Sequence, residues 1–144
     1  MFSLPVREVM EQEKLLMAPP KTTVNKAAQL MAKRNVGAVM VVDEQRLVGI
    51  FTERDALFRV IARSLDPKTT QLADVMTIAP KTVAPDETFG YALLVMQEGG
   101  FRHLPVIDND KLVGIVSARN ALDPDLEEFV SESERRKKIL RERS

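Results

Sequence analysis

Two nine-residue stretches of the chain repeat one pattern of hydrogen-bonding side chains. The first, at residues 49–57, reads GIFTERDAL, and GIVSARNAL follows 65 positions later. Each stretch places a hydroxyl three residues before a side chain that accepts hydrogen bonds: Thr52 precedes Asp55, and Ser117 precedes Asn120. The second copy therefore keeps the spacing of the first, but an amide replaces the carboxylate.

The pair of Thr52 and Asp55 is open to two interpretations. If a helix begins at Glu53, Thr52 is its N-cap and Asp55 reaches back to the Thr52 amide, as in a capping box. The start of a helix also presents free amide donors and the positive end of the helix dipole, which suit the polar groups of a ligand. A hydroxyl and a carboxylate at this spacing could then accept hydrogen bonds from the adjacent hydroxyls of a ribose.

The composition argues against several classes of function. Among 144 residues, 21 are Lys or Arg and 21 are Asp or Glu, so no global field favours nucleic acid or an anionic membrane. The chain has no Cys, one His and no clustered carboxylates, which argues against a nucleophile–base pair, a metal site and therefore an enzyme. The longest apolar run is too short to span a bilayer, and the first residues lack the features of a secretory leader. We therefore expect a cytoplasmic protein without a membrane or nucleic-acid partner.

The repeated stretch belongs to a longer internal repeat. A shift of 65 positions aligns residues 18–57 with residues 83–122 without a gap. Equal spacing over two halves indicates two copies of one fold. A half of roughly 60 residues cannot bury much apolar surface alone. We therefore expect the halves to pack strand face to strand face, with pseudo-twofold symmetry and matching clefts between them.

Each half shows the same order of predicted elements: an extended segment, a helix, two strands joined by a short hairpin, and a second helix. The predicted fold class is therefore α+β, with the order β-α-β-β-α occurring twice. The extended segments are 17–22 and 81–85, the helices fall within 22–35, 53–64, 88–99 and 118–122, and the strands are 38–43, 46–52, 103–108 and 111–117. The predicted units are a first repeat at 4–64, a second repeat at 65–122 and a charged helical tail at 123–144.

These repeats, with their Gly-hydrophobic-x-Thr/Ser-x-x-Asp motif, resemble the cystathionine β-synthase (CBS) domain. Their tandem arrangement resembles a CBS pair, or Bateman module, over residues 4–122. One motif alone has little specificity, but two motifs in register with RHLPVID are strongly specific. In CBS pairs that bind adenosine nucleotides, the Thr and Asp of this motif hold the ribose. The resemblance therefore favours the ligand interpretation at Thr52 and Asp55.

The resemblance also implies the other walls of the site. In the family, a cleft combines the Thr/Asp motif of one repeat with basic residues of the other, which hold phosphates through charge-assisted hydrogen bonds. The base would lie against an apolar strand residue and the extended segment that follows the linker. We expect this first site to be occupied, and its residues are Ile50, Thr52, Asp55, Pro80, Lys81, Thr82, Arg102, His103 and Arg119.

A mirror-related second site is expected to bind more weakly. Its residues would be Arg54, Ser117 and Asn120. Asn120 lacks the charge of a carboxylate and one of its two strong acceptors. Gly37 and Ala38 stand where the second repeat has Arg102 and His103, so the phosphates would lose two cations. Asn still caps a helix well, so the second copy is expected to keep its structural role.

The resemblance implies a regulatory sensor rather than an enzyme. AMP, ADP, ATP or NAD(H) would bind in the cleft, shift the arrangement of the repeats and so act on an unknown protein effector. S-adenosylmethionine shares the adenosine, but the basic residues favour an anionic tail. The alternative is a ligand-independent dimeric scaffold.

Homodimerisation is expected from the family. Leu57, Val60 and Ile61 would form a helix face with more apolar surface than the monomer core covers. The tail at 123–144 is acidic at its start and basic at its end, which matches a helix dipole. It is either a solvated terminal helix or a helix packed across the dimer.

Overall fold

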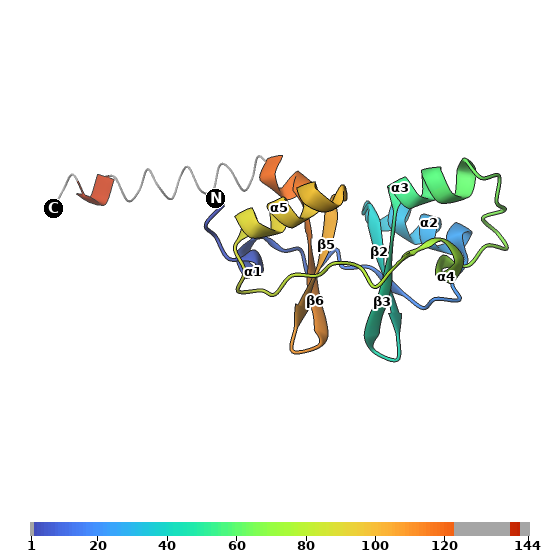
Figure 1. Cartoon of the computed structure of the whole chain (residues 1–144), viewed down its shortest axis with the longest axis horizontal. Coiled ribbons are helices and arrows are strands. Elements are labelled where there is room, and N and C mark those ends of the chain that lie inside the picture. The colour runs from blue at the N-terminus through green and yellow to red at the C-terminus, as the bar shows by residue number, and fades with distance from the viewer. Residues whose placement is uncertain (1, 123–138, 142–144) are drawn as a thin grey trace.

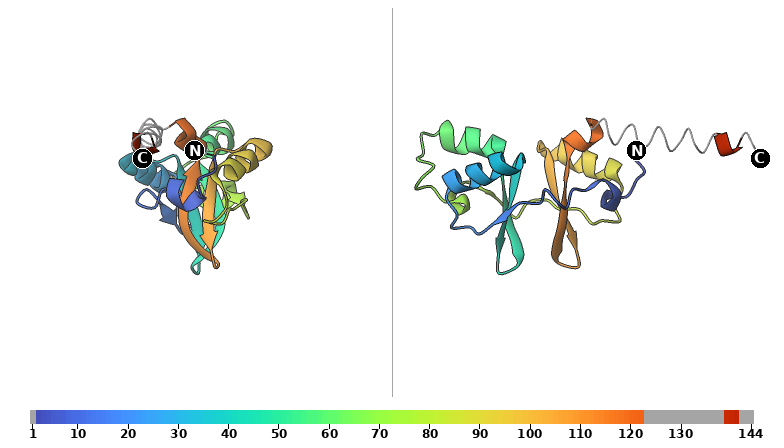
Figure 2. Two further views of the ribbon diagram at one scale, coloured as in Figure 1. Left: turned by 90° about the vertical axis from the view of Figure 1, so that its left-hand side faces the viewer. Right: turned by 180° about the vertical axis from the view of Figure 1, so that it is seen from behind.

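The computed structural model describes residues 2–122 and 139–141 and shows two lobes of similar construction (Figure 1). In each lobe a β-hairpin stands next to the other lobe, and helices lie on its outer side (Figures 1 and 2). The elements in chain order are α1 (Val6–Val9), β1 (Met17–Ala18), α2 (Val24–Arg34), β2 (Ala38–Asp43), β3 (Arg46–Thr52), α3 (Glu53–Asp55), the π-helix η1 (Ala56–Ile61), α4 (Leu72–Val75), β4 (Thr77–Ile78), α5 (Phe89–Gly99), β5 (His103–Asp108), β6 (Lys111–Ser117) and the 3₁₀-helix η2 (Ala118–Leu122). The mixed α+β class is confirmed, and both halves contain the helix, the two strands and the final helix. In the second half the predicted extended segment 81–85 makes only an isolated bridge, from Val83 to Val106. The expected tail helix lies outside the described residues, apart from the helical residues 139–141.

The two long helices, α2 and α5, begin and end in the same way. The hydroxyl of Thr23 accepts a hydrogen bond from the Lys26 amide at 3.2 Å, and that of Thr88 accepts one from the Tyr91 amide at 3.1 Å. Such N-caps satisfy amides that have no partner inside a helix. Each helix ends at a left-handed residue: Asn35, with φ 54°, for α2, and Gly100, with φ 71°, for α5. The sequence repeat is therefore a repeat of local structure.

Both predicted hairpins are present. In β2–β3 the turn residues Glu44 and Gln45 have φ of 49° and 68°, and in β5–β6 Asn109 and Asp110 have φ of 49° and 64°. Positive φ at both central residues is the signature of the type I′ turn, which suits the twist of a hairpin. β1 and β4 extend the first hairpin to the sheet order β1-β2-β3-β4, whereas the second sheet contains only β5 and β6.

Two short helices, α1 and α4, each pack in the lobe that does not contain the strands of their own half. The buried core of the first lobe contains Leu72 and Val75 from α4, which belongs to the linker. The buried core of the second lobe contains Val6 and Val9 from α1, which lies at the start of the predicted first repeat. A third buried cluster joins the facing hairpins, and it consists of Ala38, Met40, Ile50 and Ile115. The expected packing of strand face against strand face is therefore confirmed, and it fixes the two lobes against each other.

The helix predicted within residues 53–64 differs from expectation. It begins as α3 but continues as the π-helix η1, which ends at Ile61. Val60 is buried in the first core, so its assignment to an exposed helix face is wrong, although Leu57 and Ile61 are exposed. π-Helical turns are rare, and they occur frequently at functional sites.

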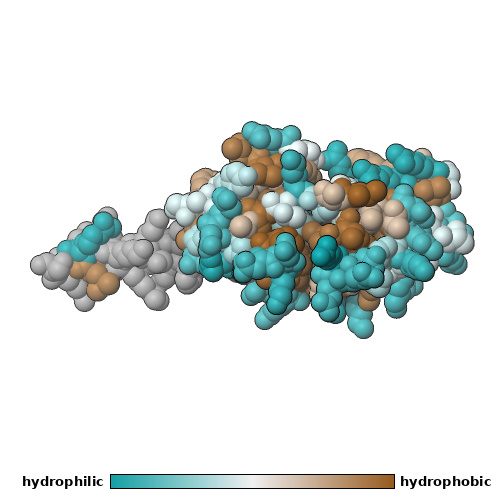
Figure 3. All heavy atoms as spheres, turned by 60° about the horizontal axis from the view of Figure 1, so that its bottom comes forward, coloured by the Kyte–Doolittle hydropathy of each residue, from teal (hydrophilic) through white to brown (hydrophobic). Residues whose placement is uncertain are grey.

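The surface differs between the middle and the rim of the molecule. Figure 3, which brings the hairpin side forward, shows hydrophobic residues gathered toward the middle and a largely hydrophilic rim. None of the helices within residues 2–122 and 139–141 has the length and apolar character needed to cross a lipid bilayer.

Candidate functional site

A cavity of about 940 Å³, called cavity A below, lies between the lobes. Residues of β3, α3 and η1 form one side, and residues that precede β5 and begin it form the other. The linker after β4 completes the lining. Most residues predicted for the first site line this cavity, namely Ile50, Thr52, Asp55, Pro80, Lys81, Arg102 and His103.

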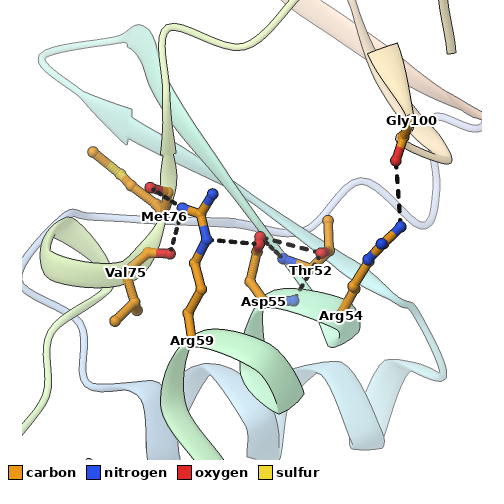
Figure 4. Close-up of polar contacts among 7 residues, drawn as sticks. All are labelled: Thr52, Arg54, Asp55, Arg59, Val75, Met76 and Gly100. Atoms are coloured by element: carbon orange, nitrogen blue, oxygen red, sulfur yellow. Dashed lines mark hydrogen bonds and ion pairs between the residues drawn. The ribbon is translucent and has the colours of Figure 1, made fainter. Parts of the chain in front are cut away.

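Thr52 and Asp55 form a reciprocal cap at the start of α3 (Figure 4). The Asp55 amide donates to the Thr52 hydroxyl oxygen at 3.2 Å, and the Thr52 amide donates to Asp55 Oδ2 at 2.9 Å. The Thr52 hydroxyl also donates to Asp55 Oδ2, at 3.1 Å. The capping-box interpretation is therefore confirmed. Because both residues also line cavity A, the cap holds a hydroxyl and a carboxylate at its surface.

Arg59 holds the outer oxygen of this carboxylate, and the sequence analysis did not include it. Its Nε lies 3.5 Å from Asp55 Oδ1, and its Nη1 donates to the carbonyls of Val75 and Met76 at 3.2 and 3.1 Å (Figure 4). Arg59 therefore connects η1 to the end of α4 and orients Asp55. The spacing of four residues between an acid and a base on a helix was the available signal.

Arg54 lies in cavity A, whereas the sequence analysis assigned it to the second site. Its Nη1 donates to the carbonyl of Gly100 at 3.3 Å, across the cavity at the end of α5 (Figure 4). Its guanidinium carbon lies 5.1 Å from the centroid of the Phe58 ring, within the range of a cation–π contact. This corrects the assignment of Arg54 to the second site. The Arg54 side chain starts beside its own motif in the first lobe and reaches across cavity A to the second lobe.

The remaining cations of cavity A are available to a ligand. Lys81 comes from the linker and Arg102 from the segment before β5. Within residues 2–122, no carboxylate lies within ion-pair distance of Lys81, Arg102 or Arg54. The cavity therefore has a carboxylate acceptor at Asp55, Arg102 on the facing side, and cations without an ion-pair partner among residues 2–122.

His103 is partly buried at the start of β5, and its environment disfavours the charged form. Burial lowers its pKa below the usual 6.5, and the positive charges of Arg119 and Arg102 act in the same direction. The carboxylates of Glu53 and Glu11 oppose this shift. The imidazole is therefore mainly neutral at pH 7, which corrects the counting of His103 with Arg102 as one of two cations.

A much smaller cavity of about 30 Å³, called cavity B below, occupies the mirror-related position. Six of its lining residues matter for the comparison with cavity A: Glu11, Gly37, Ala38, His103, Ser117 and Arg119. Arg119 was predicted for the first site, and its position beside Ser117 corrects that assignment. His103 lines both cavities, which explains why it senses the charge of Arg119.

Asn120 has the expected capping role. Its Oδ1 accepts a hydrogen bond from the Ser117 amide at 2.8 Å, as Asp55 does in the first lobe. Its Nδ2 donates to Glu11 Oε1 at 3.4 Å, and the side chain is buried. Thr82, predicted to contact the base, lines a third cavity of about 390 Å³ on the far side of Pro80.

The fold and the two capped motifs define a tandem repeat with a cavity between its lobes. The family profile of the CBS domain matches the chain twice, at residues 6–62 and 72–125. Each match contains one copy of the repeated motif. The chain therefore belongs to the CBS domain family, and it contains two such domains in tandem.

Curated relatives share the sequence over part of their length. The chain is 33% identical over 131 residues to the Meiotically up-regulated gene 70 protein of Schizosaccharomyces pombe, covering 83% of this chain and 18% of that protein. It is 37% identical over 110 residues to the CBS domain-containing protein CBSCBSPB5 of Arabidopsis thaliana, covering 76% of this chain and 20% of that protein. The chain thus spans about a fifth of the length of these relatives.

Solved structures share the fold over nearly their whole length. An uncharacterized conserved protein from Pyrococcus horikoshii has a TM-score of 0.79 and 30% identity, covering 85% of this chain and 92% of that one. The CBS domain protein PAE2072 from Pyrobaculum aerophilum, complexed with AMP, has a TM-score of 0.76 and 25% identity, and the match covers 89% of this chain and 99% of that one. The CBS domain pair of MJ0100, in complex with 5′-methylthioadenosine and S-adenosyl-L-methionine, has a TM-score of 0.71 and 26% identity, covering 82% and 92%.

Proposed function

We propose that cavity A binds an adenosine compound with an anionic tail, such as AMP, ADP, ATP or NAD(H), and that binding regulates a separate protein. The observation that carries the proposal is the chemistry of the two facing walls. Thr52 and Asp55 lie on one side, Arg102 lies on the other and Lys81 lies on the linker. Within residues 2–122 neither of these two cations has an ion-pair partner. The complexes of similar proteins with AMP and with 5′-methylthioadenosine support an adenosine ligand.

Each group of the ligand has a matching group in the cavity. The Asp55 carboxylate can accept hydrogen bonds from the ribose hydroxyls, because its side chain is 13% exposed and Arg59 holds it in place. The base fits against Ile50 and Pro80, which are two of the apolar residues that line the cavity. Lys81 and Arg102 can donate charge-assisted hydrogen bonds to phosphate oxygens. These cations favour an anionic tail over the positively charged sulfonium of S-adenosylmethionine.

Regulation follows from the position of the cavity. Its lining comes from both lobes and from the linker, so one ligand would contact all three. A ligand changes the balance between two arrangements only when it binds one of them more tightly. A molecule held between two lobes meets this condition, and the change would be transmitted to a partner protein. The chain has no Cys and one His, so we propose no catalytic step.

Calorimetric titration with AMP, ATP and NADH tests this proposal. We expect binding of at least one of them, and we expect Asp55→Ala to weaken it by about tenfold or more, since a hydrogen bond to a charged group contributes about 1.5–3 kcal/mol. Asp43→Ala removes an exposed carboxylate from β2 and is the matched control. The absence of a heat change with all three ligands up to millimolar concentration contradicts the proposal.

A second candidate function is a dimeric scaffold that needs no ligand. The observation that favours it is a set of exposed apolar side chains on η1 and α5, which lie on the side opposite the hairpin tips (Figure 1). These side chains are Leu57, Phe58, Ile61, Tyr91 and Leu94. Exposed apolar surface of this kind marks interaction sites. Sedimentation of Ile61→Glu tests the homodimer, and unchanged partner binding by Asp55→Ala and Arg102→Ala distinguishes the scaffold from the sensor.

A further inference from the structure

Arg54 is the one described side chain of cavity A that hydrogen-bonds across from the first lobe to the second. Its donor group is charged, but its acceptor, the carbonyl of Gly100, is neutral and lies 3.3 Å away in an exposed position. Hydrogen bonds with one charged partner gain strength when the other partner is charged as well. A phosphate in cavity A would therefore be a stronger acceptor for Arg54 than its present one.

The end of α5 is closed within its own lobe, where the amides of Gly100 and Phe101 donate to the carbonyls of Gln97 and Met96 at 3.3 and 3.1 Å. Gly100 has φ 71°, and a Cβ at this position would meet no atom within 4 Å. The position of a Gly100 side chain is thus open, and the contact with Arg54 ties the Gly100 carbonyl to the first lobe (Figure 4). Loss of this contact would free the C-terminal end of α5 from the first lobe.

Phe58 holds the guanidinium over the cavity. The ring is half-exposed, lies one helical turn after Arg54, and has its centroid 5.1 Å from the guanidinium carbon. A cation–π contact restricts a long side chain without pairing its hydrogen-bond donors with an anion. Phe58 is therefore a positioning residue for Arg54.

We propose that Arg54 exchanges the Gly100 carbonyl for the anionic tail of the ligand, so that it both selects charged ligands and reports their binding to α5. This inference rests on the proposed function, because it requires an adenosine ligand in cavity A. It adds a residue of the first lobe to the anion-binding set, beside Lys81 and Arg102. It also predicts that adenosine, which lacks an anionic tail, binds without releasing the contact.

The test compares adenosine with AMP in calorimetric titrations of the full chain. We expect Arg54→Ala to weaken AMP by about tenfold and to leave adenosine within about twofold, because one charge-assisted contact is lost. Arg54→Lys keeps the charge but not the planar guanidinium, so its affinity for AMP is expected to lie between those of the wild type and Arg54→Ala. Phe58→Ala should reduce the ratio of AMP to adenosine affinity, which loss of packing alone would not do. Arg63→Ala removes an exposed charge just after η1 and is the matched control.

Side-chain NMR of labelled arginine tests the exchange itself. The Arg54 Nε signal, assigned from its loss in Arg54→Lys, should shift when AMP is added and remain in place when adenosine is added. Wild-type affinity of Arg54→Ala for AMP, or an Arg54 signal that AMP does not move, overturns the inference while leaving the proposed function intact. Failure of the wild-type chain to bind adenosine, AMP, ATP and NADH contradicts the proposed function and this inference with it.

Discussion

Cavities A and B are built from the same motif, but they differ about thirtyfold in volume, at about 940 and 30 Å³. Both begin with a hydroxyl residue whose amide donates to the side chain three residues later. The distance is 2.9 Å from Thr52 to Asp55 and 2.8 Å from Ser117 to Asn120. The motif therefore serves the same capping role twice, and it does not by itself determine the size of the cavity beside it.

The facing walls of the two cavities also differ in composition. Cavity A has Arg102 and His103, and cavity B has Gly37 and Ala38 at the equivalent positions. A Cβ on Gly37 would lie 3.1 Å from Glu53 Oε1 and 3.4 Å from His103 Nε2. Side chains that border cavity A thus also approach the backbone that lines cavity B. A repeated fold can become functionally unequal through a few residues that face the motif rather than belong to it.

The largest effect on AMP affinity is expected when the two residues Arg102 and His103 of cavity A are replaced by their equivalents in cavity B, Gly and Ala. Arg102→Gly together with His103→Ala removes two donors to a phosphate, each contributing about 1.5 kcal/mol or more. AMP affinity should fall by about 100-fold. Calorimetry measures the loss, and thermal unfolding of the same variant shows whether the lobe remains folded. An unchanged AMP affinity would contradict the comparison of the two cavities, because it would show that Arg102 and His103 do not contribute to AMP binding.

A smaller effect is expected when the carboxylate is exchanged for the amide. Asp55→Asn should keep the cap, because Asn120 already makes the same bond, but lose the charge that faces Arg59 and the ribose. AMP affinity should fall by about tenfold, with a change of less than about 1 kcal/mol in the free energy of unfolding. Asn120→Asp is the reciprocal control and should create no second site. Equal AMP affinity of the wild type and Asp55→Asn would show that the Asp55 carboxylate does not contribute to binding.

The pH dependence should be a severalfold effect with a defined sign. Burial holds the pKa of His103 below 6.5, and an adjacent phosphate would raise it, so binding takes up a proton and AMP affinity should increase as pH falls toward 6. The phosphate of AMP also titrates near pH 6, so the measured quantity is the difference in slope between wild type and His103→Gln. Identical slopes contradict a contact between the imidazole and the phosphate.

Without ligand the same shift has the opposite consequence for stability. In the unfolded chain the pKa of His103 is 6.5, whereas in the folded chain burial lowers this pKa, so the folded chain takes up the proton only at lower pH. The free energy of unfolding should therefore decrease as pH falls below 6.5, until the folded pKa is reached. Urea unfolding of wild type and His103→Gln isolates this contribution.

The smallest effect concerns Arg59, which has no counterpart contact in the described part of the second lobe. Arg59→Ala removes a half-exposed ion pair and two hydrogen bonds to the carbonyls of Val75 and Met76. Since the pair is partly solvated, we expect a loss of about 1 kcal/mol in the free energy of unfolding. Urea unfolding measures it, with Arg63→Ala as the control. A loss equal to that of the control shows that the contacts of Arg59 do not stabilise the first lobe.

Local features of the fold could be predicted from the sequence because they depend on neighbouring residues. The spacing of Thr52 and Asp55 specified a cap, and the short polar connections specified hairpins. The pairing of α1 with the second lobe and of α4 with the first could not be predicted, since their short apolar patterns carry no information on which core they join. The π-helical form of η1 likewise has no recognised pattern in the sequence.

The errors at the site have a common cause. Arg54 and Arg119 occupy the same position of the motif, and the prediction exchanged their sites because the direction of a long side chain depends on the opposite lobe. Thr82 lines the third cavity together with Ala79 and Pro80, so the linker borders two cavities, and its sequence does not show which residue faces which.

The inequality of the two cavities is tested most directly by the stoichiometry of AMP binding to the wild-type chain. We expect one AMP per chain in calorimetry, with binding lost in the Arg102→Gly, His103→Ala variant and retained in Ser117→Ala. Two equivalent sites per chain, or binding that depends on Ser117 and not on Arg102 and His103, would show that cavity A is not the distinguishing feature of this molecule.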